Sequence, residues 1–269
     1  MAIPAAIPAK VRVNRMLLAL AGGLLSVLLV LPVWRLGWLE TWEGRTWDWR
    51  ARLLARPGAA TPEIVLVLVD QNSLDWGKEV NDWPWPWPRE VTGAMIRYVT
   101  RCRPRAVAVD VLFTEPSRFG VDDDAALAEA LAATGASAAA MVLGESTGSD
   151  VAWPEGLGDK GITVDGIEEW RYRDAVDYPR ALFPIPEVAA AADLLGNVTL
   201  APDPDGIYRR APFFSLVADG VLPGMALAAH AAAKPDETIR VDDTALHVGD
   251  RRIALDDRGR AILRFRGPA

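Results

Sequence analysis

The stretches Ile64–Asp70 (IVLVLVD) and Ala106–Phe113 (AVAVDVLF) decide the fold that the sequence predicts. Both contain unbroken, valine-rich apolar runs, which are typical of strands buried on both faces of a parallel sheet. Between them, the segment PREVTGAMIRYVTRC carries apolar residues at helical spacing. Two strands joined through a helix form a βαβ unit, whose crossover is nearly always right-handed.

Each apolar run is followed by an acid, Asp70 in the first and Asp110 in the second. Open α/β sheets bind ligands outside the carboxyl ends of their strands, so we expect both acids near the rim of any pocket. A divalent cation held with Asp122 is one use of these carboxylates, since hard cations prefer several oxygen ligands. Capping of loops and helix N-termini is the structural alternative.

A block of alternating tryptophan and proline, Trp83–Pro88, follows the first run. Alternating proline is incompatible with a helix or a central strand, because it removes backbone donors and clashes. We expect a stiff loop over the carboxyl edge of the sheet, with Trp87 facing a ligand or partner, or packed as a lid on the protein's own core. Pro88 suits the first turn of the next helix, where Arg89 is placed to help hold an anion.

Residues 16–34 contain no charged side chain (MLLALAGGLLSVLLVLPVW). At 1.5 Å per residue they span about 28 Å, close to the hydrocarbon core of a bilayer. Lys10, Arg12 and Arg15 precede them, so the positive-inside rule places the N-terminus in the cytoplasm. The bulky exit Pro32–Arg35 argues against a cleaved signal peptide. We predict a basic cytoplasmic tail at 1–15 and a transmembrane helix in the inner (plasma) membrane.

Residues 35–58 are predicted to form a juxtamembrane helix, with Leu39, Trp42, Trp49 and Leu53 on roughly one face. The helix is either a stalk packed on the domain or a lever that passes motion to the membrane, and the sequence does not separate the two. Residues 59–269 then form one extracytoplasmic domain.

The rest of that domain alternates helical and β-rich segments. Taken together, the patterns predict an α/β fold with a mixed, mostly parallel sheet flanked by helices and ending in a C-terminal β-meander, preceded by one transmembrane helix. The predicted elements are an alanine-rich helix after Asp122–Asp124, a buried strand at Ser137–Leu143, a helix at Pro186–Leu195 capped by Gly196, a turn at Pro202–Gly206 and a helix at Pro223–Ala233.

Composition and missing motifs exclude several classes of protein. The net charge is −7 although the N-terminal tail is basic, which argues against nucleic acid as a partner. The single cysteine, Cys102, cannot form an intrachain disulfide and is expected to be buried in a helix. There is no zinc-ligand spacing and no GxGxxG, Walker A, GxSxG or HExxH motif. We therefore predict no catalytic residue, metal or cofactor.

The order of several short motifs resembles the type-2 CHASE domain, an extracellular sensor module of bacterial signalling receptors. The resemblance covers most of residues 44–268. Its pieces are Asp48-Trp49-Arg50, Glu63-Ile64-Val65, Asp70 with Ser73-Leu74, Trp85–Arg89, Asp110–Phe113 with Glu115-Pro116, Asp122-Asp123, Gly196-Asn197, and Asp205-Gly206 with Arg209-Arg210.

The resemblance implies further sheet residues and a cytoplasmic output domain, such as a cyclase or a kinase, beyond a chain that stops inside the sensor domain. It also implies a homodimer. Our first hypothesis is a membrane-anchored sensor for a small ligand. A metal-dependent extracytoplasmic hydrolase and a non-sensing docking scaffold are the alternatives. For the sensor, we predict that the ligand lies near Asp70, Trp87, Arg89, Asp110 and Arg209.

Overall fold

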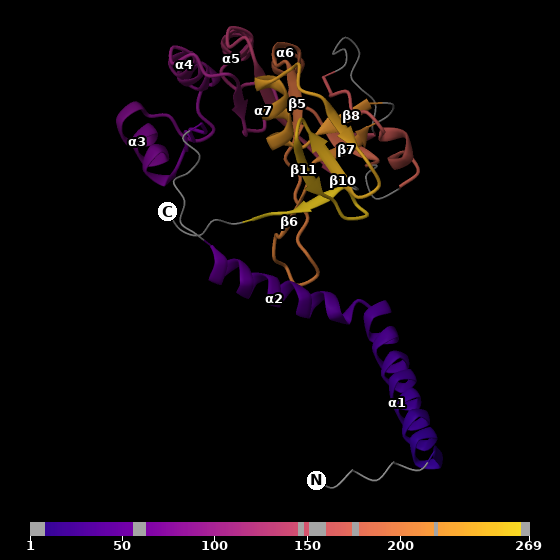
Figure 1. Cartoon of the computed structure of the whole chain (residues 1–269). Helices are drawn as coiled ribbons and strands as arrows, with labels where there is room; N and C mark the ends of the chain where they lie inside the picture. Colours follow the sequence, from indigo (N-terminus) through magenta and orange to yellow (C-terminus); the bar gives the residue numbers. More distant parts are fainter. Residues whose placement is uncertain are drawn as a thin grey trace. The chain divides into compact units, whose positions relative to one another are not determined.

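The computed structural model describes residues 9–55, 63–144, 148–150, 160–173, 178–217 and 220–264. The chain divides into two compact units. One comprises Met1–Ile64 with Arg264–Ala269, and the other comprises Val65–Leu263. Figure 1 shows the elements of each unit along the chain.

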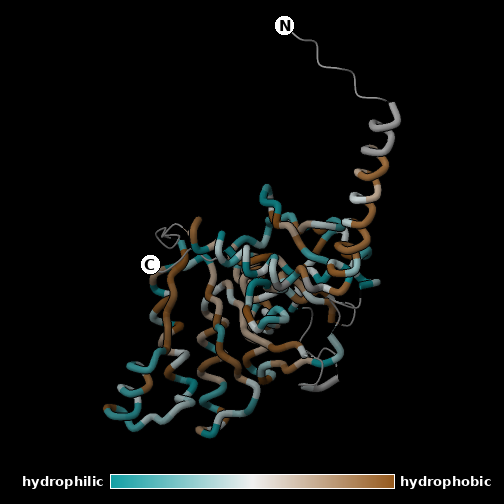
Figure 2. The backbone as a smooth tube through the Cα atoms, turned by 90° about the horizontal axis from the view of Figure 1, so that it is seen from below, coloured by the Kyte–Doolittle hydropathy of each residue, from teal (hydrophilic) through white to brown (hydrophobic). Residues whose placement is uncertain are grey.

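Two helices make up the described part of the first unit. Helix α1 (Ala9–Arg35) contains the stretch Met16–Arg35, which is long and apolar enough to cross a membrane. Figure 2 shows this stretch as mainly hydrophobic. Gly37 separates α1 from α2 (Trp38–Leu54) because its φ of 71° is left-handed, a conformation that glycine adopts without strain. The two sequence patterns thus form distinct helices.

The largest sheet lies in the second unit and is organised around β2 (Ser137–Gly144). β2 pairs in parallel with β1 (Val107–Val109) on one side and with β5 (Leu194–Asn197) on the other. The far end of β2 pairs with β4 (Arg180–Leu182), which pairs in turn with β3 (Ser149–Asp150), both in antiparallel fashion. The buried strand predicted at Ser137–Leu143 is therefore confirmed, and it is the centre of the sheet.

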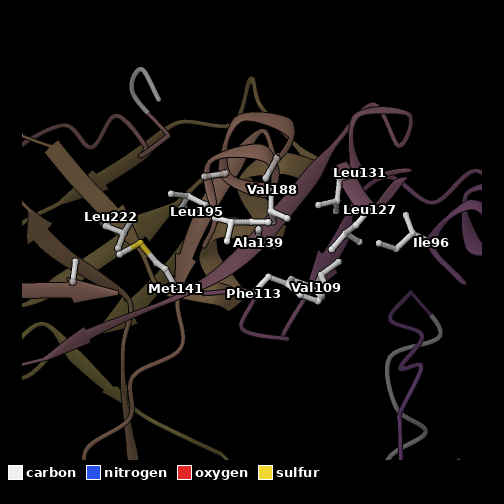
Figure 3. Close-up of a cluster of buried hydrophobic side chains, with 14 of the residues drawn as sticks. Ile96, Val109, Phe113, Leu127, Leu131, Ala139, Met141, Val188, Leu195 and Leu222 are labelled. Atoms are coloured by element: carbon white, nitrogen blue, oxygen red, sulfur yellow. The ribbon is translucent and has the colours of Figure 1, made fainter. Parts of the chain in front are cut away.

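Helices pack on both faces of this sheet. Helices α4 (Arg89–Thr100), α5 (Val121–Ala132) and α6 (Pro186–Ala191) share one hydrophobic cluster with the sheet. Alternate β2 residues Ala139, Met141 and Leu143 belong to that cluster. Figure 3 shows Ala139 and Met141 within it. Helix α7 (Met225–Ala233) packs against β2 and β5 through the opposite face, where Gly196 meets Met225 and Ala228. Covering both faces explains why β2 is apolar without alternation.

A second hydrophobic cluster holds the C-terminal strands together. Trp170, at the end of the 3₁₀ helix η1 (Ile167–Trp170), meets Phe214 edge to face with ring centroids 5.3 Å apart. Both side chains are fully buried among residues of the surrounding strands. These strands are β7 (Phe214–Val217), β8 (Gly220–Pro223), β9 (Ile239–Val241), β10 (Ala245–Val248) and β11 (Arg251–Ala254).

The mixed α/β class is confirmed, but the prediction of a mostly parallel sheet is wrong. Among the strand pairings described, only β1–β2 and β2–β5 are parallel. β9, β10 and β11 form a three-stranded antiparallel sheet, whereas β12 (Arg260–Ile262) leaves it and pairs with β6 (Arg210–Pro212). The tail is therefore not one continuous meander, because its last strand, β12, pairs with β6 from earlier in the chain.

The stretch Ile64–Asp70 differs most from its predicted role. It forms no strand, and its side chains are exposed instead of buried in the sheet. Asp70 then begins helix α3 (Gln71–Asn81), which the sequence analysis did not predict. The apolar composition shows that burying the segment would be favourable in free energy. It does not specify whether a neighbouring strand pairs with the segment.

Two local predictions also fail. Helix α4 ends at Thr100, so Cys102 lies in the following turn and is exposed, not buried in the helix. Helix α6 ends at Ala191, and Gly196 lies inside β5 instead of capping the helix. In both cases the helix ends earlier than the apolar pattern predicts, and the residues beyond its end form a turn or a strand.

Replacing Gly196 by alanine is expected to destabilise the domain by about 1–3 kcal/mol, the usual cost of overpacking a core. A Cβ at this position would lie 2.8 Å from the Cα of Met225, which is backbone and cannot rotate away. Denaturant unfolding of the full chain in detergent measures the change. An unchanged unfolding midpoint would show that α7 is not held against β5 as described.

Candidate functional site

A buried ionic cluster joins the N-termini of α4 and α5. The Arg89 guanidinium donates to the Asp124 carboxylate and to the backbone carbonyl oxygen of Glu115. Arg89 and Asp124 are 8% and 4% exposed, so the two charges are largely removed from water. The guanidinium carbon also lies 5.3 Å from the centre of the Phe113 ring. Arg89 thus ties α4 to α5 and to the loop after β1.

The neighbouring Asp123 caps a helix other than its own. Its carboxylate accepts hydrogen bonds from the backbone N–H groups of Arg89 and Glu90, each at 2.8 Å, which are the first residues of α4. Ser117 donates its hydroxyl to the same carboxylate. Burial alone would raise the pKa of Asp123, but these hydrogen bonds outweigh it and lower the pKa. In the first turn of α5, Asp123 therefore caps α4, and Asp124 is the ion-pair partner of Arg89.

Asp70 and Trp87 both lie against α3. Asp70 caps the helix by accepting hydrogen bonds from the backbone N–H and hydroxyl of Ser73 at 2.9 and 2.8 Å, and these two bonds lower its pKa. Trp87 packs on Gly77, where an added Cβ would lie 2.6 Å from the indole nitrogen. That indole N–H is buried and has no hydrogen-bond partner among the residues that the structure describes. Figure 1 shows α3 directly before the loop that leads to α4.

The Trp/Pro block is a loop held by its own surroundings. Arg118 donates to the backbone carbonyl oxygens of Pro84 and Pro86, both at 3.0 Å. The rings of Trp85 and Trp87 meet edge to face with centroids 5.9 Å apart. Trp87 is half-buried, whereas 53% of Trp85 is exposed. The loop agrees with the packed-lid interpretation for Trp87, and it leaves one aromatic ring facing solvent.

Arg209 belongs to a second ionic cluster, separate from that of Arg89. It forms a bidentate pair with Asp205, with both N–O distances 2.8 Å, and lies 3.3 Å from Asp203. Asp203 also pairs with Arg210 at 2.6 Å. The hydrogen bonds from Arg209 are the main reason that the pKa of Asp205 falls to about 2. The guanidinium of Arg209, which was predicted to bind a ligand, is thus paired with Asp205 inside the protein.

Asp110 directly follows β1 at the carboxyl end of the strand and is exposed. Asp70, the other carboxylate among the five predicted ligand residues, is exposed as well. Arg89 and Arg209 are buried in two different clusters, while Asp70 and Trp87 contact α3. The structure therefore distributes these residues over several local roles, and their part in ligand binding stays a prediction.

A cleft of about 530 Å³ lies at the opposite edge of the central sheet. Gly135 and Ala136 precede β2, and Asp193 precedes β5, so the cleft opens at the amino ends of these parallel strands. The other walls come from residues 161–163 and Asp165, and from the end of α7 with the segment that follows it. A cavity of this size is within the range that small molecules occupy in proteins.

The cleft combines apolar and acidic side chains. Ile162, Leu194 and Ile239 contribute apolar surface, and Asp193 accepts hydrogen bonds from the backbone N–H and hydroxyl of Ser137 at 2.7 and 3.0 Å. Glu237 is held in place by hydrogen bonds with His230 and Lys234, which lower its pKa, the His230 bond most strongly. Hydrogen bonds within the protein thus fix the positions of two acids of the cleft, Asp193 and Glu237, in the absence of a ligand.

Sequence reasoning missed this cleft because its walls come from four separate stretches of chain. Two of these stretches meet only because β2 pairs in parallel with β5, which brings Ala136 and Asp193 to the same edge. That pairing joins strands more than fifty residues apart, and no local pattern reports it.

Asp124→Leu is expected to cost about 3–5 kcal/mol of folding stability, because it leaves the Arg89 charge buried without its partner. Arg89→Met combined with Asp124→Leu should recover part of the loss, since apolar side chains replace both charges. Denaturant unfolding of the two variants measures this difference. A single variant as stable as the wild type would contradict a structural role for the pair.

Acid should weaken the Arg209 cluster in a defined pH window. The native pKa of Asp205 is about 2, below the ordinary value near 3.8, so its contribution is present at neutral pH and is lost as the pH falls from about 4 to about 2. The difference in thermal unfolding midpoint between the wild type and Asp205→Asn should therefore shrink over that window. A constant difference would exclude Asp205 as the source.

Comparison with known proteins identifies the family of the chain. The model of the CHASE2 domain family matches residues 25–269, which is most of the sequence. The chain therefore belongs to the CHASE2 domain family, a family of extracellular sensor domains of signalling receptors. No curated protein and no solved structure matches the chain.

Proposed function

We propose that this chain is the membrane-anchored sensor part of a signalling receptor and that it binds a small molecule outside the cell. Membership of the CHASE2 family is the observation that carries the proposal. The apolar helix within α1 supports the anchor, because Met16–Arg35 has the length and hydropathy of a membrane span. The basic residues before it favour a cytoplasmic N-terminus in the inner membrane.

The cleft at the amino ends of β2 and β5 is the place where the structure best supports a ligand. It offers volume, apolar walls and acids that neighbouring groups already orient. Arg89 and Arg209 are less suited to bind an anion, since carboxylates in the protein already pair with both guanidinium groups. Asp110 and Trp87, on the carboxyl side, stay the alternative location that the sequence predicts.

Signal transfer requires a ligand that binds two states of the domain with different affinity. In our proposal α2, which follows the membrane helix in sequence, carries the difference toward the bilayer. A homodimer would pass it to a cytoplasmic cyclase or kinase. The proposal assigns catalysis to that output and none to the sensor domain.

A thermal-shift screen of the full chain in detergent against small metabolites tests the proposal. A ligand present at 100 times its dissociation constant should stabilise the protein by about 2.7 kcal/mol, which gives a measurable shift. If the cleft is the site, Thr163→Trp should abolish the shift by filling the cleft from an exposed position, while Asp110→Asn should retain it.

The opposite result, with the shift lost only in Asp110→Asn, would move the site to the carboxyl edge of the sheet. If both variants keep the ligand-induced shift, the ligand binds neither in the cleft nor at Asp110. A shift produced by a divalent metal alone, together with metal-dependent turnover, would favour the hydrolase instead. Within the residues that the structure describes, however, no group of three or more His, Cys, Asp or Glu side chains is arranged to hold a metal ion.

A further inference from the structure

Five consecutive apolar residues, Val65–Val69, lie exposed on the second unit. The exposed fractions are between 60% and 82% from Val65 to Leu68 and 37% at Val69. The segment contains no charge, no proline and no glycine, and it alternates valine with leucine, so it has strong β-propensity. An exposed stretch of this composition is what proteins usually cover, because it pairs readily with any open strand.

The same unit contains an open strand edge that fits this segment. β1 ends the order of strands in the described sheet and pairs only with β2 there. Val107 donates its backbone N–H to Ala136 on the β2 side at 2.9 Å. Because backbone groups alternate along a strand, the N–H and C=O of Ala108 point to the unpaired side. Ala108 itself is exposed.

We propose that Val65–Val69 docks on the open edge of β1 as an additional parallel strand, and that the exposed segment is the undocked state of a two-state element. Val67, Leu68 and Val69 would then lie beside Val107, Ala108 and Val109. This register places Asp70 next to Asp110, so both apolar runs end at the same edge of the sheet. It also directs Val67 and Val69 to the face on which Val109 joins the core.

The occupant of the β1 edge is this chain and not a second copy. Helices α3 and α4 lie between the segment and β1 in sequence, which is the connection that parallel neighbours require. A tethered strand also has an effective concentration on the order of millimolar, far above that of a second molecule. Strands of a parallel sheet that is covered on both faces are apolar on both sides, as Val65–Val69 is.

Docking would change the chain between the membrane helix and the sheet. The segment begins eleven residues after Leu54, the last residue of α2, so docking would fix the point at which the chain that follows the membrane helix joins the sheet. Such an element gives the domain two arrangements that a signal can bias. The inference rests on the exposed segment and the open edge, and it does not depend on the proposed ligand.

A pair of cysteines tests the register directly. In full-length protein carrying Cys102→Ser, Leu68→Cys and Ala108→Cys would lie on adjacent strands about 4.8 Å apart, within the range of about 4.4–6.8 Å that a disulfide needs between Cα atoms. Val80→Cys with Ala108→Cys is the matched control, because Val80 is 65% exposed and belongs to α3. Both pairs are oxidised mildly in detergent and analysed on non-reducing gels and by peptide mass spectrometry.

Docking predicts an intrachain disulfide in the Leu68–Ala108 pair at several times the yield of the control pair. Equal yields would overturn the proposal. A predominantly interchain disulfide would also overturn it, because the edge would then be occupied by a second copy.

A measurement without cysteines gives an independent result. Val67→Lys should lower the thermal unfolding midpoint of the full chain, whereas Val80→Lys should leave it nearly unchanged, although the two valines are similarly exposed at 60% and 65%. Hydrogen exchange of the wild type should show protected amides in Val65–Val69. Unprotected amides together with equal midpoints would show that the segment does not dock.

Discussion

The buried pair between Arg89 and Asp124 is the interaction on which the arrangement of the helices around the central sheet depends. Arg89 holds three elements at once, since its guanidinium reaches α5 and the loop after β1 while its own backbone begins α4. Asp123 completes the arrangement by capping α4 from α5. Two charges are stable here because each has a partner and further hydrogen bonds, which offset the loss of water.

The charged groups that stabilise the fold are therefore different from the groups that line the cleft. The charged residues that stand out most in the sequence, around Arg89 and Arg209, neutralise one another inside the protein. The cleft at the amino edge uses acids that attract less attention in the sequence, Asp193 and Glu237, which lie beside apolar walls. In our proposal, this cleft is the surface that the domain offers to a ligand.

In our proposal, the segment before α3 and the sheet edge at β1 form the element through which the domain signals. A sensor must have two arrangements of similar free energy, and an apolar strand next to an incomplete sheet is a simple way to obtain them. The family assignment and the apolar helix at Met16–Arg35 place this element in a chain that can be anchored in a membrane. The domain thus combines an ion-paired core with an exposed apolar segment.

The sequence alone determined the features that depend on local composition. The apolar span at 16–34, the central strand at Ser137–Leu143, the turn at Pro202–Gly206 and the family resemblance follow from residue type and spacing. The tertiary structure alone decided that Ile64–Val69 is exposed, that Arg89 pairs with Asp124, and that four distant stretches form a cleft. The physical reason is that periodicity shows which side chains gain by burial, whereas the partner that buries or neutralises them is set by contacts between residues far apart in the chain.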